Sequence, residues 1–170
     1  GINGNTIATV DVASNTIDGY IRVDARPSKL QMSADGSILF VSFDSADRIT
    51  EIDPATATVT RTTPIPLVLP IPPGIEARPR VAIDMHASPV DSALAVVEIG
   101  EGYQTLNLSE YSAIRSGVWL SDALQRNNMG STQDRALNFD TTGTLYDIGR
   151  DLNGYVVEEI SAGLNGLTSV

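Results

Sequence analysis

The chain has 170 residues, of which 42% are hydrophobic and 19% charged, and its 21 acidic against 11 basic residues give a net charge of −10. This composition excludes general disorder, and the acidic balance argues against nucleic acid as the main partner. The sequence has no cysteine and one histidine, and it has no stretch near the about 20 apolar residues of a membrane span. Disulfides, multi-histidine metal centres and a transmembrane segment are therefore not expected.

The first predicted unit covers residues 5–24 and holds two short strands. The residues before it carry no charged and apolar leader, so we expect no signal peptide within this chain. The segment Thr6–Ile17 returns at Arg48–Val59 with the same apolar alternation and the same turn chemistry. The matching pairs are Ile7 and Ile49, Val10 and Ile52, Asp11 and Asp53, Ala13 and Ala55, and Thr16 and Thr58. A period of about 42 residues is typical of propellers and solenoid arrays.

The second predicted unit covers residues 26–63 and holds four strands. Ile38–Phe43 is an almost continuous apolar run, as expected of a strand buried on both faces. Ile49–Ile52 alternates between apolar and polar residues, as a half-buried strand does. Turns are predicted at Asp35-Gly36 and at Asp53–Thr56, because Asp bonds its own backbone and Gly adopts positive φ.

A proline-rich segment, residues 64–73, interrupts the period. Proline lacks the N–H of a sheet ladder and favours polyproline II geometry, so the segment is predicted to connect two units. The alternative interpretation is a docking arm for a protein partner. In that case the interacting residues are Pro64, Pro66, Pro70, Pro72 and Pro73.

Two further units are predicted at residues 78–119, with four strands, and at residues 134–170, with three or four. In the third unit, Gln104–Tyr111 resembles a degenerate copy of the Asp turn of the first unit. In the fourth, Phe139–Tyr146 echoes the Asp-Gly turn of the second. Between the two units, Ser121–Gln125 is compatible with one helical turn, followed by a polar loop.

These elements together predict an all-β fold, a β-propeller-like array of four-stranded antiparallel blades in a single domain. The units amount to about three to four blades, whereas a closed propeller uses four to eight. The chain is therefore expected to be a fragment of a longer propeller or an open array that associates with itself.

One stretch of the sequence resembles a known repeat family. The residues that carry the resemblance are Arg26-Pro27, Ser33–Gly36, Leu39–Ser42 and Ile49–Thr56. They are similar to the YVTN-type β-propeller repeat, in which a Pro opens the unit and Asp-Gly and Ile-Asp-x-x-Thr turns join its strands. The match covers residues 5–63 and weakens after residue 80, where His86–Asp91 replaces the short Asp-Gly turn.

The resemblance implies an extracytoplasmic protein, either secreted, periplasmic or on the cell surface, that binds other proteins or serves as a surface module. Some similar propellers are lactone hydrolases or oxidoreductases that use a quinone or a metal. Their catalytic residues match no position of this sequence, so the resemblance assigns no catalytic residue.

Two sets of residues are candidates for chemistry. His86 beside Asp84 is a candidate general base oriented by a carboxylate, with a solvent-facing or turn-bonded histidine as the alternative interpretation. Calcium takes six to eight oxygen ligands, but no acidic group has the spacing of a dedicated calcium loop. The weak calcium candidates are Asp44, Asp47, Asp140 and Asp147. No other cofactor is predicted.

Three functional hypotheses follow from these features. The first is a non-catalytic, extracytoplasmic propeller module with a role in protein binding or surface structure. The second is a metal-assisted, lactonase-like hydrolase whose acidic ligands come from several blades. The third is a propeller fragment completed by another chain or a second copy, through open strand edges at residues 5–12 and 164–170.

Overall fold

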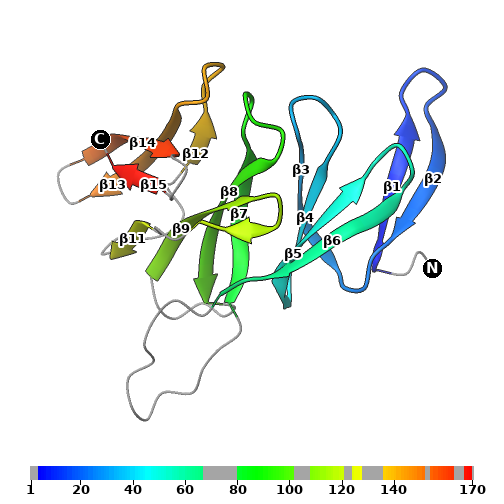
Figure 1. Ribbon diagram of the computed structural model, residues 1–170, viewed down its shortest axis with the longest axis horizontal. Coiled ribbons are helices and arrows are strands. Elements are labelled where there is room, and N and C mark those ends of the chain that lie inside the picture. The colour runs from blue at the N-terminus through cyan, green and yellow to red at the C-terminus, as the bar shows by residue number, and fades with distance from the viewer. Residues whose placement is uncertain are drawn as a thin grey trace, which may run out of the picture.

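The protein is an array of four antiparallel β-sheets that lie side by side in chain order (Figure 1). The computed structural model describes residues 4–66, 80–101, 108–120, 124–127, 136–151, 154–162 and 167–169. Within these ranges every regular element is a strand, and we find no helix with the length and hydropathy of a membrane span. The all-β architecture predicted from the sequence is confirmed.

The first sheet has two strands and the second has four. The first consists of β1 (Thr6–Asp11) and β2 (Thr16–Arg22). The second consists of β3 (Pro27–Met32), β4 (Leu39–Phe43), β5 (Ala46–Asp53) and β6 (Thr58–Pro64), paired in that order. These are the strand numbers expected for residues 5–24 and 26–63.

The third and fourth sheets follow the same plan. The third consists of β7 (Arg80–Ala87), β8 (Leu94–Glu101), β9 (Leu108–Arg115), β10 (Val118–Trp119) and β11 (Leu124–Asn127). The short strands β10 and β11 pair with successive parts of β9, so together they form one interrupted outer strand. The fourth consists of β12 (Ala136–Phe139), β13 (Leu145–Asp151), β14 (Gly154–Ala162) and β15 (Leu167–Ser169).

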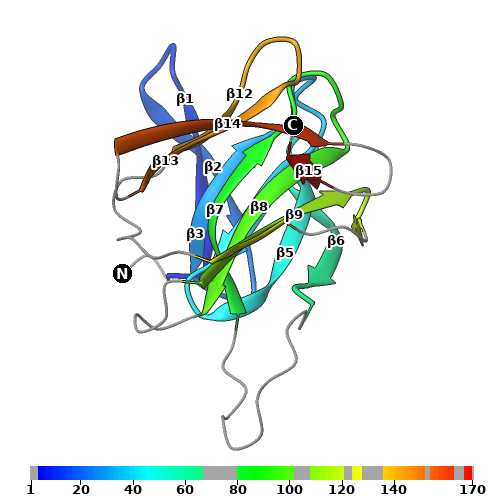
Figure 2. The same cartoon turned by 90° about the vertical axis from the view of Figure 1, so that its left-hand side faces the viewer.

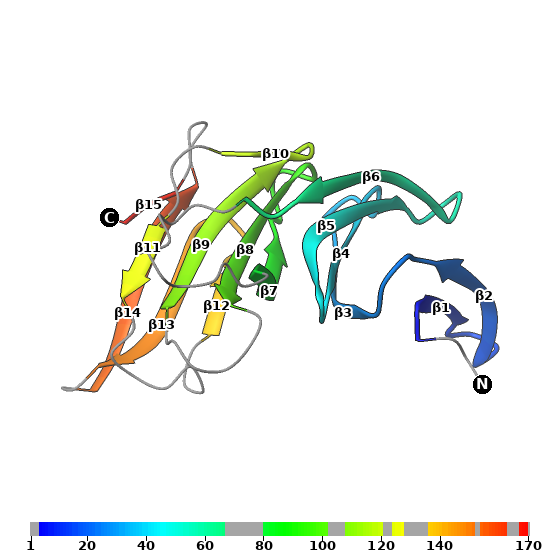
Figure 3. The ribbon, with the colours of Figure 1, turned by 90° about the horizontal axis from the view of Figure 1, so that it is seen from below.

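Seen from below, the sheets fan out around their first strands (Figure 3). β3, β7 and β12 lie on the inner side of the fan, and β6, β10 and β15 lie on its outer side. We call β3, β7 and β12 the inner strands.

The internal repeat is reproduced in the structure of the two hairpins. β1 pairs with β2 in the register in which β5 pairs with β6, and both hairpins have a bulge at the same place, after Thr9 and after Glu51. The Asp11 carboxylate accepts the Ala13 N–H at 2.8 Å, and Asp53 accepts the Ala55 N–H at the same distance. Because the two hairpins share their register, their bulge and their Asp-turn hydrogen bonds, the periodicity of the sequence is confirmed.

A second recurring element is the turn that joins the first two strands of a sheet, which we call the inner turn. The inner turns span Ser33–Ile38, Ser88–Leu94 and Asp140–Thr144, and in each the first residue donates its N–H to the carbonyl of the last, at 2.8–2.9 Å. The turn of the third sheet is one residue longer than that of the second but keeps this bond. The echo predicted at Phe139–Tyr146 is confirmed.

Consecutive sheets bury a hydrophobic cluster between them. Ile7, Ile21 and Val23 of the first hairpin pack on Val41 and Phe43 of the second sheet. The second and third sheets bury a cluster that includes Phe40, Ile49, Met85 and Val97. The third and fourth bury Val96, Tyr111, Leu145 and Ile160. β4 contributes side chains to the clusters on both of its faces, as its apolar run Ile38–Phe43 predicted, and β8 does the same in the third sheet.

Two sequence predictions in the third unit are wrong. A copy of the Asp turn was predicted at Gln104–Tyr111, but Leu108–Tyr111 is the beginning of strand β9. The turn that joins β9 to β10 is instead at Ser116-Gly117. The helical turn proposed at Ser121–Gln125 is also wrong for its last two residues, which belong to β11. β11 therefore extends the third sheet beyond residue 119, the predicted end of this unit, because pairing with β9 holds Leu124–Asn127 extended.

Candidate functional site

The polar cluster predicted around His86 lies on two inner strands. His86 Nε2 is 3.0 Å from Asp84 Oδ2 on β7, and Lys29 Nζ of β3 is 3.7 Å from Asp84 Oδ1. The same Asp84 oxygen accepts the Met85 N–H at 2.9 Å. The carboxylate therefore links the second and third sheets while it orients the imidazole. A carboxylate-oriented imidazole is able to act as a general base.

The cluster offers few ligands to a metal ion. It contains one imidazole and one carboxylate, beside the positive charge of Lys29. Within the described ranges no three side chains among His, Asp and Glu come together as a set that could hold a metal ion.

The four calcium candidates lie in separate environments. Asp44 is exposed and forms an ion pair with Arg26 Nε at 3.1 Å, and Asp47 is exposed nearby on β5. Asp140 closes the inner turn of the fourth sheet by accepting the N–H groups of Thr142 and Thr144, each at 2.9 Å. Asp147 is buried at the boundary of the third and fourth sheets, where it accepts the Tyr111 hydroxyl at 3.3 Å. Asp140 thus stabilises a turn, and Asp147 stabilises the boundary between two sheets.

Two of the five candidate interaction prolines are described, and both lie against the third sheet. The Pro64 carbonyl accepts the Trp119 indole N–H at 2.7 Å, and the Pro66 carbonyl accepts Arg80 Nη1 at 3.1 Å. Ile65 between them is buried. Pro70, Pro72 and Pro73 lie outside the described residues. The first residues of this segment thus contact the third sheet through their backbone carbonyls.

A buried carboxylate that the sequence pattern did not single out lies between the second and third sheets. The Glu51 side chain is 6% exposed, and its Oε2 is 3.3 Å from Arg61 Nη1. The Gly117 N–H of the third sheet also donates to this carboxylate. Burial raises the pKa of Glu51, against the opposing effects of Arg61 and the Gly117 N–H. In the sequence, Glu51 is a polar position of a strand that alternates between apolar and polar residues. That pattern predicts an exposed side chain, so it did not indicate that the third sheet covers Glu51.

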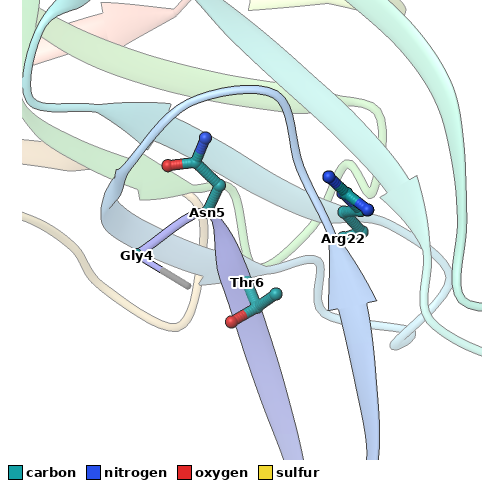
Figure 4. A pocket seen from close by; sticks show the side chains of 4 residues that line it. All are labelled: Gly4, Asn5, Thr6 and Arg22. Carbon is teal, nitrogen blue, oxygen red and sulfur yellow. The ribbon is translucent and has the colours of Figure 1, made fainter. Parts of the chain in front are cut away.

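Two hollows share the exposed Arg22 side chain. One is lined by Gly4, Asn5, Thr6 and Arg22, where β1 begins and β2 ends (Figure 4). The other lies between the first and second sheets and is lined by Arg22, Val23, Asp24, Thr50, Val59 and Thr62. Their walls carry the Arg22 guanidinium, the Asp24 carboxylate, the Asn5 amide and several hydroxyls, a set suited to polar contacts.

The outer face of the fourth sheet exposes apolar side chains. Ile148 and Val157 lie opposite each other on β13 and β14 and are 41% and 63% exposed. Figure 2 views the array from the end that carries this sheet. At the other end of the array, Val10 lies opposite Ile17 on the first sheet, and both are exposed. In the sequence these residues look like ordinary strand positions. The order of the sheets shows that they lie on the two end faces of the array.

Comparison with known proteins identifies the fold. No family model and no curated protein sequence matches the chain. It is similar to the WD40 domain of Toxoplasma gondii coronin, with a TM-score of 0.65 and 14% identity over 98% of this chain and 40% of that chain. It is also similar to a chain in the crystal structure of the mitotic checkpoint complex, with a TM-score of 0.57 and 13% identity over 91% of this chain and 40% of that chain.

At these identities the likeness shows the fold alone. The chain has a β-propeller-type repeat fold, as the sequence predicted, and it spans 40% of the length of each of these two structures. Its four sheets therefore correspond to part of a propeller.

Proposed function

We propose that this chain is a non-catalytic part of a β-propeller protein and acts by binding other proteins. The observation that carries the proposal is the outer face of the fourth sheet. There, Tyr146 lies opposite Glu159, in the positions that Phe40 and Glu51 occupy on the second sheet. Phe40 and Glu51 are buried by the third sheet, whereas Glu159 is exposed.

The exposed apolar pair next to these residues supports a protein partner. Ile148 and Val157 form a patch on a sheet face whose counterpart inside the array is a core. Exposed apolar side chains that lie next to each other on a sheet face offer contact area to a protein partner. The similar chain in the mitotic checkpoint complex is part of an assembly of proteins, according to the name of that structure.

The proposal includes an extracytoplasmic location and membership of the YVTN-type repeat family. Both rest on the resemblance of residues 5–63 to that repeat. Fractionation of the source cells, with detection of the native protein, is expected to recover it outside the cytoplasm. Recovery in the cytoplasm alone would contradict the location.

Site-specific photo-crosslinking tests the protein partner. A photoreactive residue at Val157 in the protein of the source cell is expected to give adducts with a second protein. Val12, which is 88% exposed in a turn of the first sheet, is the matched control and is expected to give few adducts. No intermolecular adduct at Val157, or equal adducts at both positions, would overturn the proposal.

A metal-assisted hydrolase is the second candidate, and the pairing of His86 with Asp84 favours it. A lactone hydrolysis assay of the chain, with and without added calcium, separates the two candidates. We expect no turnover above background, and the same result for His86→Gln. Calcium-dependent turnover that His86→Gln abolishes would favour the hydrolase and contradict a non-catalytic role.

A further inference from the structure

The hollow between the first and second sheets has a volume of about 400 Å³. Its walls are the end of β2 with the two residues that follow, and one face of β5 and β6. Val59 of β6 is 48% exposed there, although it lies opposite the fully buried Ile52. Thr50 and Thr62, which lie opposite each other, add two hydroxyls to the same wall. An apolar side chain thus remains open to solvent at the rim of a core between two sheets.

The equivalent place between the second and third sheets is occupied by an indole ring. Trp119 of β10 lies opposite Ile114, which faces the second sheet. Val59 lies opposite Ile52, which faces the first sheet, so Val59 and Trp119 have the same position in their hairpins. Trp119 packs against the core of its boundary, and its Nε1–H donates to the Pro64 carbonyl of β6 at 2.7 Å. The indole therefore fills the space that is hollow between the first two sheets.

The first sheet offers the same hydrogen-bond acceptor as the second. Arg22 is the counterpart of Pro64 in the repeat, and it lines the hollow. The residues that follow, Val23 and Ile65, are each 5% exposed and donate their N–H groups to the preceding strand, at 2.9 and 2.7 Å. Because successive peptide groups of a strand point to opposite sides, the Arg22 carbonyl points away from β1, as the Pro64 carbonyl points away from β5. An indole in the hollow therefore has an acceptor for its N–H.

We infer that this hollow binds a tryptophan side chain of a protein partner, in the manner of Trp119 at the next boundary. The ring covers Val59, and its N–H donates to the Arg22 carbonyl. The exposed Arg22 guanidinium provides a cation beside the face of the ring. Trp119 is held through its side chain alone, so this mode of binding suits a tryptophan within a peptide chain. The inference goes beyond the proposed function, which concerns the outer face of the fourth sheet.

NMR spectra of the isotope-labelled chain test the site. The probe is N-acetyl-tryptophanamide, which presents the indole between two peptide groups. Saturable shifts are expected at the Val23 and Val59 methyl groups and at the Thr62 amide, because these residues line the hollow. No saturable shift, or shifts confined to residues outside the hollow, would overturn the inference. This measurement uses the unmodified chain and does not depend on the folding of a variant.

Two further compounds test which group the hollow recognises. The analogue with a methylated indole nitrogen keeps the ring but lacks the N–H, and it is expected to bind about two- to tenfold more weakly. Equal binding of this analogue would contradict the hydrogen bond to the Arg22 carbonyl. Free tryptophan is expected to bind no more tightly than N-acetyl-tryptophanamide. Tighter binding of free tryptophan would overturn the inference, since the site would then recognise an amino acid and not a protein.

Val59→Trp supplies from within the chain the ring that the hollow lacks. It is expected to weaken the binding of N-acetyl-tryptophanamide at least about tenfold, because the new side chain takes the place of the ligand. Ile17→Trp is the matched control, since Ile17 has the same position in the first hairpin and is 52% exposed outside the hollow. Wild-type affinity in a folded Val59→Trp variant would overturn the inference. These readouts are independent of crosslinking at Val157.

Discussion

At the scale of single residues, aspartate side chains hold the turns of this protein together. Asp53 accepts the N–H groups of Ala55 and Thr56 at 2.8 and 3.3 Å, and its other oxygen accepts the Thr56 hydroxyl at 2.8 Å. Hydrogen bonds to the charged form lower the pKa of a carboxyl group. The pKa values of Asp53 and its counterpart Asp11 are accordingly lowered, first by the side-chain hydroxyls of Thr56 and Ser14.

These turns are expected to lose stability in acid. The pKa values of Asp11, Asp35, Asp53 and Asp140 are lowered from the ordinary 3.8. A lowered pKa in the folded state gives stability that is present above the unfolded pKa and is lost as pH falls through the folded one. Urea midpoints measured from neutral pH to strong acid are expected to fall steeply below about pH 4.

Asp53→Asn isolates one of these groups, since the amide oxygen still accepts N–H donors but does not titrate. Its urea midpoint is expected to fall less steeply in acid than that of the wild type. Asp18→Asn, at an exposed position of β2, is the control. A wild-type slope in Asp53→Asn would mean that the turn carboxylate does not provide the acid sensitivity.

Glu51 is expected to have the opposite pH dependence. Because burial raises its pKa above the ordinary 4.5, its contribution to stability is complete below that value and is lost as pH rises through the raised pKa. Glu51→Gln is therefore expected to gain stability relative to the wild type as pH rises toward neutral. Glu159→Gln, at the equivalent but exposed position, is expected to follow the wild type, and thermal melts between pH 4 and 8 compare the three.

At the scale of elements, the Ser116-Gly117 turn of the third sheet lies against the outer strand of the second. Gly117 has a φ of 73°, its carbonyl accepts the Thr63 hydroxyl at 3.2 Å, and its N–H donates to Glu51. A Cβ at Gly117 would overlap Arg61 Cδ. The turn thus holds two sheets together without an apolar side chain.

Gly117→Ala is expected to cost more stability than the same substitution at Gly36. Both glycines have a φ of 73°, so both variants place alanine in the left-handed region, at a cost of about 1–2 kcal/mol. At Gly36 no heavy atom lies within 4 Å of the new Cβ, whereas at Gly117 Arg61 must move away from Glu51. We expect an additional loss of about 1–3 kcal/mol in chemical denaturation. Equal losses would show that Arg61 moves without cost.

Local chemistry explains which elements the sequence predicted well. The hairpin of residues 48–59 depends on Asp53 and its own neighbours, so twelve residues carry the information. The interrupted outer strand of the third sheet depends on more than its own sequence neighbours, because Leu124–Asn127 is extended through pairing with β9. The burial of Glu51 likewise depends on Gly117, a residue of another sheet. Contacts between sheets were therefore the part that periodicity did not predict.

At the scale of the whole molecule, the described strands of each sheet make their main contacts with the sheets next to it in the chain. Three hydrophobic clusters and a few polar contacts, such as Lys29 with Asp84 and Tyr111 with Asp147, join the four sheets. The inner turns also touch across sheets, since the Ser92 side chain bonds to Asp35 and Val90 lies against Gly143. The result is an array with two ends and a core that is divided among its boundaries.

The division of the core predicts different costs for two similar substitutions. Met85→Ala removes a fully buried side chain between the second and third sheets and is expected to cost about 2–5 kcal/mol. Leu30→Ala, at the equivalent but half-exposed position, is expected to cost less than about 1 kcal/mol. Urea denaturation compares the two. A large loss in Leu30→Ala would mean that the chain already covers this position.

The stacking of sheets in chain order also affects the order in which backbone amides open to solvent. In a row of units, an end unit has one neighbour and an inner unit has two, so the ends open at a lower free energy. Among the described residues, the first sheet has one hydrogen-bonded strand pair and one neighbouring sheet, whereas the third has neighbours on both faces. Amide hydrogen exchange is therefore expected to be fastest in β1 and β2 and slowest in β8, at the centre of the third sheet.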